Sequence, residues 1–165
     1  LDYPTFDEMF KAGAEHNLAL SFLMTNEELP EIERMCERFP ETPVILDHVC
    51  GCRIREGRFP ATEVDRLCAV ARHPKVMVKL GPMHGLSDKE APFLELLPVI
   101  ERVVDAFGPE RCMWESDSGG PGEMTDPVRD YAASVALINE GAEFLSDSDR
   151  EQILFGTAER FFFDR

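Results

Sequence analysis

Short apolar runs alternate with helical patterns along the whole chain. Four runs are the right length for buried strands: residues 18–23, 43–47, 76–80 and 111–115. Each is followed by apolar residues at the spacing of a helix. Short buried strands separated by helices of ten or more residues indicate βαβ units and a parallel α/β sheet with sequential strands and helices on one side. The periodicity is compatible with both an open doubly wound sheet and a barrel.

Proline and serine positions suggest where some of these helices begin. Pro92 suits the first turn of the third helix, and Pro98 either kinks that helix or marks its start. A helix is predicted over 126–140, and Ser146 is the expected N-cap of the next one. We find no linker or internal repeat, so residues 1–165 are treated as one domain.

Composition narrows the classes of function. The net charge of -15 argues against binding to nucleic acid or to an anionic membrane surface. No apolar run approaches the roughly 20 residues that cross a bilayer, and the acidic N-terminus does not resemble a signal peptide. The five scattered cysteines are typical of reduced thiols in a cytoplasmic protein. A small-molecule substrate is therefore expected.

Two polar residues come directly after predicted strands. His48 follows the second strand in LDHV, and there it could transfer a proton, bind a metal or simply satisfy a backbone carbonyl. Asp117 follows the fourth strand in WESDSGGPG, and it could hold a divalent metal, take a proton from water or cap the next turn. Because the carboxyl ends of parallel strands share one edge, we expect the two side chains to approach within roughly 10 Å.

Three basic residues are candidates for substrate binding. Arg53 lies on the loop after His48 and could clamp a substrate carboxylate. Lys79 lies inside the third strand and points either into a barrel or toward a helix end, and His84 lies on the loop beyond it. A structural or solvated role is the alternative for both. The Cys-x-Cys of HVCGCR, without a second pair, is weak evidence for zinc.

Four stretches, in this order, resemble patterns of the amidohydrolase-related (amidohydrolase 2) family, which includes lactonases and nonoxidative decarboxylases. They are RFPETPVILDHVCG, HPKVMVKLG, FGPERCMWESD and LSDSDREQILFGTAERFF. The resemblance implies a (β/α)8 barrel of the TIM type, with these four strands as its fifth to eighth. A whole barrel needs roughly 200–250 residues, so the chain is expected to be a C-terminal half. A missing N-terminal half, or a homo-oligomer, would complete it.

The resemblance also implies roles for individual residues. Asp117 matches a metal ligand that acts as general base, and His48 matches a histidine that lies beside the metal-bound water or polarises the substrate carbonyl. The implied cofactor is a divalent metal, with zinc first. The family's His-x-His is absent from this sequence and would lie in the missing half; its absence favours an inactive remnant for this chain in isolation. The first of the four strands ends without a His or an acid, which favours a branch with an incomplete or absent metal site, in which Asp117 activates water directly.

Some residues depart from the family's pattern. Glu115 replaces a small residue and could crowd the site or add charge to it, and Thr157 replaces the usual Asn. The leading hypothesis is hydrolysis of a small carboxylated lactone or similar cyclic ester. One alternative is metal-dependent nonoxidative decarboxylation of an aromatic or unsaturated acid. Another is a half-barrel fragment that has lost its chemistry.

Overall fold

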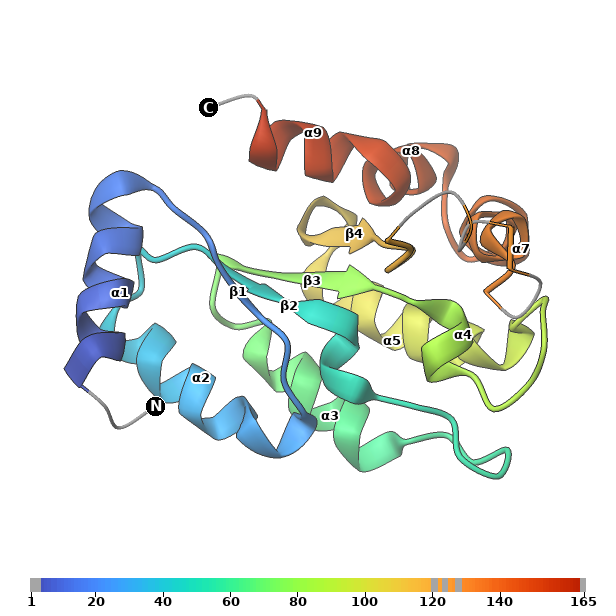
Figure 1. Ribbon diagram of the computed structural model, residues 1–165, viewed down its shortest axis with the longest axis horizontal. Coiled ribbons are helices and arrows are strands. Elements are labelled where there is room, and N and C mark those ends of the chain that lie inside the picture. Colours follow the sequence, from blue (N-terminus) through green and yellow to red (C-terminus); the bar gives the residue numbers. More distant parts are fainter. Residues whose placement is uncertain (1–3, 120–121, 123–124, 127–128, 164–165) are drawn as a thin grey trace.

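Helices and short strands alternate along the chain (Figure 1). The computed structural model describes residues 4–119, 122, 125–126 and 129–163. The strands are β1 (Leu20–Phe22), β2 (Val44–Leu46), β3 (Val76–Leu80) and β4 (Cys112–Trp114). The α-helices are α1 (Pro4–His16), α2 (Leu29–Arg38), α3 (Ala61–Val70), α4 (Met83–Leu86), α5 (Leu97–Phe107), α7 (Tyr131–Ala136), α8 (Asp147–Glu151) and α9 (Thr157–Phe162). The 3-10 and π turns are η1 (Asn26–Glu28), η2 (Asp47–Gly51), η3 (Leu94–Leu96), η4 (Pro109–Arg111), η5 (Leu137–Gly141) and η6 (Gln152–Gly156).

The four strands form one parallel sheet in the order β1-β2-β3-β4. The predicted parallel α/β sheet with sequential strands is therefore confirmed. β3 has the predicted bounds, and the other three strands are one or two residues shorter at their ends. Since parallel strands end at a common edge, the loops after β2, β3 and β4 are brought together.

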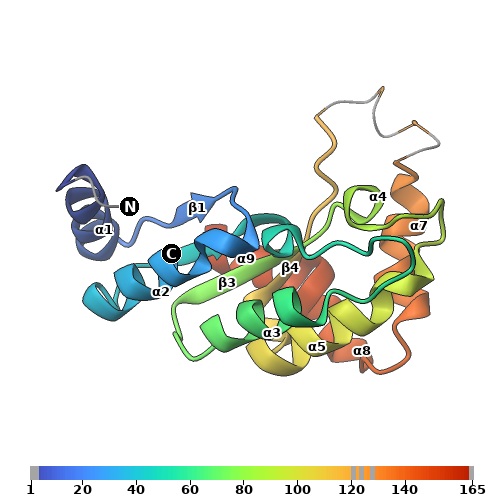
Figure 2. The ribbon, with the colours of Figure 1, turned by 90° about the horizontal axis from the view of Figure 1, so that it is seen from below.

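One face of the sheet is covered by α2, α3 and α5, which lie side by side (Figure 2). Alternate strand residues such as Leu46, Val78 and Cys112 point into this layer. They pack on helical residues such as Ile32 and Val103, all with less than a tenth of their surface exposed. This layer is the main hydrophobic core, and it holds the sheet in place from one side.

The opposite face carries a smaller apolar cluster at its amino end. Ile45, Met77 and Met113 are buried there, and Ala158 and Phe161 of α9 pack against them. Figure 1 shows α9 on the other side of the sheet from α2, α3 and α5. The expectation that all helices lie on one side is therefore wrong, because the apolar side chains on this face need a cover and the terminal helix supplies it.

Local helix signals explain some boundaries and correct one. Pro98 lies in the first turn of α5, so it marks the start of that helix rather than a kink. Ser146 caps α8 by accepting a hydrogen bond from the backbone N–H of Asp149, as predicted. The helix predicted from Asp126 instead begins at Tyr131, because the Asp130 carboxylate accepts from the N–H of Ala133 and caps it there. Residues 127–128 lie outside the described part.

The two outer strands of the sheet, β1 and β4, each have one strand neighbour within the described residues. Their outer edges can accept further strands, as the edges of a half barrel would. Among the helices of the described residues, none has the length and apolarity that crossing a lipid bilayer requires.

Candidate functional site

A row of polar side chains crosses the sheet at its carboxyl edge. The face that carries the small cluster with α9 is called the inner face from here on. Each polar residue of the row lies two positions beyond an apolar residue of that face (Ala19, Ile45, Met77 or Met113), so strand alternation places its side chain on the same face. The Ser21 hydroxyl donates to the Asp47 carboxylate at 3.0 Å. The Lys79 ammonium lies 2.7 Å from Asp47 Oδ1 and 3.5 Å from Glu115 Oε2. From β1 to the end of β4, hydrogen-bond donors (Ser21, Lys79) thus alternate with acceptors (Asp47, Glu115).

His48 joins this row to Asp117. Its Nδ1 lies 2.6 Å from Glu115 Oε1, and its Nε2 lies 3.9 Å from Asp117 Oδ2. The side chains of His48 and Glu115 are 22% and 15% exposed, whereas Asp117 is 57% exposed. Glu115 therefore holds Nδ1 of the imidazole, and Nε2 is directed toward the accessible carboxylate of Asp117. This separation lies within the roughly 10 Å expected for residues on strands that share an edge.

The backbone at both candidate residues is in the left-handed region. His48, Val49 and Cys50 have φ of 54°, 44° and 51°, and Asp117 has φ of 50°. Left-handed conformations cost L-residues roughly 1–2 kcal/mol each, and most of all a β-branched residue such as Val49. Burial of Val49 and Cys50 helps to maintain the turn. Such strained backbone is characteristic of functional sites.

The charges of the row shift the pKa values of its members. Burial raises the pKa of Glu115 above its ordinary value, against the opposing effects of His48 and Lys79. Burial alone would lower the pKa of Lys79, but the hydrogen bond to Asp47 and the charge of Glu115 raise it overall. Lys79 is therefore a charged ammonium at neutral pH, and it compensates the partly buried carboxylates of Asp47 and Glu115.

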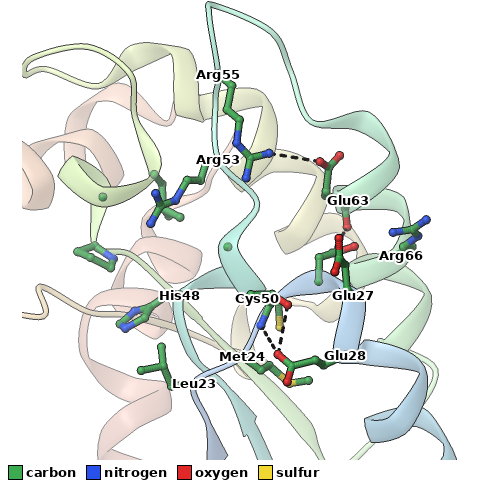
Figure 3. A pocket seen from close by; sticks show the side chains of 16 residues that line it. Leu23, Met24, Glu27, Glu28, His48, Cys50, Arg53, Arg55, Glu63 and Arg66 are labelled. Atoms are coloured by element: carbon green, nitrogen blue, oxygen red, sulfur yellow. Dashed lines mark hydrogen bonds and ion pairs between the residues drawn. The ribbon is translucent and has the colours of Figure 1, made fainter.

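A cavity of about 600 Å³ opens beside His48 (Figure 3). His48 and Arg53 line it together with the loop that follows β1 and the start of α3. Arg55 and Glu63 pair at 3.5 Å on its wall. The other charged lining residues are Glu27, Glu28 and Arg66. The cavity thus brings basic side chains close to the candidate histidine.

The structure brings some of the predicted site residues together and leaves others apart. His48, Asp117 and Lys79 belong to one connected group. Arg53 shares the cavity with His48. His84 lies in α4, whose neighbouring Pro82, Gly85 and Leu86 line the cavity while His84 itself does not. The catalytic and substrate-binding roles of these residues remain predictions.

Comparison with known proteins assigns the family. The family model for amidohydrolases matches residues 1–163. The chain belongs to the amidohydrolase family. It is 28% identical over 163 residues to an L-fucono-1,5-lactonase of Burkholderia ambifaria, and 29% identical over 154 residues to one of Burkholderia multivorans. These alignments cover 98% and 84% of this chain but 56% and 49% of the relatives, so the chain spans about half the length of the curated relatives it matches.

Solved amidohydrolases share the fold. One from Burkholderia multivorans, solved with bound zinc, superposes with a TM-score of 0.79 at 25% identity and covers 96% of this chain and 57% of its own. Amidohydrolase 2 from Bifidobacterium longum subsp. infantis gives a TM-score of 0.62 at 20% identity and covers 96% and 55%. The four-stranded sheet is thus similar to part of the amidohydrolase barrel.

One of the similar amidohydrolase structures contains zinc, so the described residues are compared with what a zinc site needs. Among the described residues, no group of three or more His, Cys, Asp or Glu is arranged to hold an ion. His48 Nε2 and Asp117 could supply two ligands, while Glu115 and Asp47 are occupied by His48 and Lys79. Zinc sites in proteins use three or four protein ligands. The described residues alone therefore do not fit a complete zinc site.

The sequence pattern alone does not predict functional roles for Asp47 and Glu115. It indicates only that Glu115 could crowd the site or add charge to it. The structure shows that Glu115 adds a charge that Lys79 and His48 compensate. The available signal was strand alternation, which places Ser21, Asp47, Lys79 and Glu115 on one face.

Proposed function

We propose that the protein is a lactone hydrolase and that this chain forms the fifth to eighth strands of its barrel. Both curated relatives are lactonases. The observation that carries the proposal is the approach of His48 Nε2 to Asp117 Oδ2, 3.9 Å, beside a cavity of about 600 Å³. A base and a proton donor at this separation can act on the same ester group.

Asp117 acts as the base in this proposal, because its carboxylate is the more accessible of the two groups. It takes a proton from a water molecule as the water oxygen bonds to the lactone carbonyl carbon. His48, protonated on both ring nitrogens with its Nδ1–H directed to Glu115, donates a hydrogen bond from Nε2–H to the carbonyl oxygen, where negative charge develops. The ring C–O bond then breaks, and the leaving oxygen takes the Nε2 proton. The proton held by Asp117 returns to His48, and the product is the open hydroxy acid.

Arg53 favours a substrate that carries a carboxylate. Its guanidinium lines the cavity with His48, and within the described residues no carboxylate pairs with it. Arg55, by comparison, is paired with Glu63. A guanidinium without a partner binds a carboxylate through two parallel hydrogen bonds. We therefore propose a small carboxylated lactone as the substrate, with Arg53 as its anchor.

The experiment is steady-state kinetics on the full-length protein with a panel of lactones, with and without a carboxylate. Asp117→Asn keeps the side-chain shape and removes the base, so turnover should be abolished while folding is nearly unchanged. His48→Asn should lower kcat at least about a hundredfold. Asp147→Asn, which changes a fully exposed carboxylate of α8, serves as the matched control and should behave as the wild type.

Two results would contradict this proposal. One is near-normal turnover of folded Asp117→Asn on a lactone that the wild type hydrolyses. The other is the absence of lactone hydrolysis across the panel in full-length protein that is well folded. The isolated 165-residue chain provides a further comparison, and it should be inactive because it spans only about half the length of the lactonases.

A further inference from the structure

Glu115 occupies an unusual position for a carboxylate. It directly follows β4, its side chain is 15% exposed, and it faces the inner side of the sheet. A charged group in such a place costs free energy unless it is paired and hydrogen-bonded.

Each oxygen of Glu115 has its own partner. Oε1 accepts a hydrogen bond from the backbone N–H of His48 at 3.0 Å and lies 2.6 Å from Nδ1 of the same residue. Oε2 lies 3.5 Å from the ammonium of Lys79. The carboxylate therefore holds both the backbone and the ring of His48, while Lys79 compensates its charge. Lys79 is in turn fixed by Asp47 at 2.7 Å.

This double contact acts where the backbone is strained. The φ of His48 is 54°, and that of the two following residues is also positive. A hydrogen bond from the His48 N–H to a partly buried carboxylate stabilises that conformation, since charge-assisted hydrogen bonds are about twice as strong as neutral ones. The same carboxylate sets the direction of the ring, because a ring that gives Nδ1–H to Glu115 must turn Nε2 toward Asp117.

We propose that Glu115 is a positioning residue that holds a proton on Nδ1 of His48, whether or not Nε2 is also protonated, and directs Nε2 into the active site. This proposal rests on the function proposed above, because it assigns how His48 is presented for that reaction. A partner that fixes the tautomer and orientation of a catalytic or metal-binding histidine typically contributes about 10- to 100-fold to activity. Glu115 itself does not touch the substrate in this scheme.

The first test is 15N NMR of the His48 ring in the full-length protein, recorded at a pH where the imidazole is neutral. The wild type should carry its proton on Nδ1. Glu115→Leu removes the acceptor at similar size, so the ring should shift toward the Nε2–H tautomer that free histidine prefers. Glu115→Gln keeps a carbonyl oxygen and should retain part of the Nδ1–H form. Glu31→Gln, in a surface ion pair of α2, is the matched control and should leave the ring signals unchanged.

The second test is kinetic. Glu115→Leu should lower kcat by about 10- to 100-fold with little change in KM, and Glu115→Gln should restore part of the loss. A wild-type ring protonated on Nε2, or unchanged ring signals in folded Glu115→Leu, would overturn the proposal. The NMR result does not depend on turnover, so the positioning role can hold even if the lactonase assay fails, and the two failures are distinguishable.

Discussion

Gly81 offers a direct test of how closely β3 and the end of β4 must approach for the site to form. Its φ is +149°, a conformation that L-residues with a side chain rarely adopt. A Cβ at this position would lie 3.1 Å from both the carbonyl carbon and Cγ of Glu115, and closer still to the carbonyl oxygen. Gly81→Ala must therefore displace the residue that holds His48.

The size of the effect follows from these contacts. Ordinary non-bonded contacts lie near 3.5 Å or beyond, so the Glu115 backbone would have to move by on the order of 1 Å. Overpacking of this kind costs about 1–3 kcal/mol, and a strained φ costs about 1–3 kcal/mol more. We therefore expect Gly81→Ala to lower the free energy of unfolding by about 2–6 kcal/mol. Misplacement by about 1 Å should also lower kcat by about a hundredfold.

Gly57→Ala is the matched control for this prediction. Its φ is +68°, but no heavy atom lies within 4 Å of the position that its Cβ would take. It therefore carries only the cost of a left-handed conformation, about 1–2 kcal/mol, and it should leave kcat unchanged. The difference between the two variants isolates the contact with Glu115.

Urea unfolding of the full-length protein, followed by far-UV circular dichroism, measures both variants. The midpoint should fall further for Gly81→Ala than for Gly57→Ala, with a similar slope. Kinetics on the full-length variants give the second readout. If Gly81→Ala were as stable as Gly57→Ala and as active as the wild type, the close approach of Gly81 to Glu115 would not be required for the site.

Four further outcomes are expected. Arg53→Ala should raise KM for a carboxylated lactone by about tenfold or more with kcat little changed, measured by steady-state kinetics, because it removes a charge-assisted anchor. Arg111→Met should lower the free energy of unfolding by about 2–4 kcal/mol in urea titrations, because the guanidinium donates to the carbonyls of Phe107, Ala71 and His73 at 2.7, 2.9 and 3.1 Å. The pKa of Lys79 is raised above 10.5, so its ion pairs stabilise the fold below that pH and this contribution is lost as the pH rises through the raised pKa. Stability measured across pH 9–12 (about the range that brackets this titration) should therefore show a decline that Lys79→Met lacks. Finally, the isolated chain should self-associate in sedimentation experiments through its open strand edges, and a stable monomer would contradict the half-barrel interpretation.

Apolar spacing along the chain is enough to predict most of the elements and their order. Strands separated by helices follow from apolar spacing, and Ser146 and Pro98 mark helix starts through backbone chemistry that acts within one turn. The position of His48 and Asp117 at one edge also followed, since parallel strands end together. These signals are local, or depend only on strand direction, and they can be read without coordinates.

Tertiary structure alone decided the partners of the charged residues. Glu115 and His48 are 67 positions apart in the chain, and no local preference predicts that their side chains meet. The left-handed turn at His48 is equally hidden, because intrinsic preferences oppose positive φ at Val49 and only contacts from other strands can maintain it. The packing of α9 on the inner face likewise depends on which apolar surface the assembled sheet leaves uncovered. Contacts between distant segments stabilise the protein only after the sheet has brought those segments together. They therefore depend on the whole fold and cannot be predicted from any one stretch of sequence.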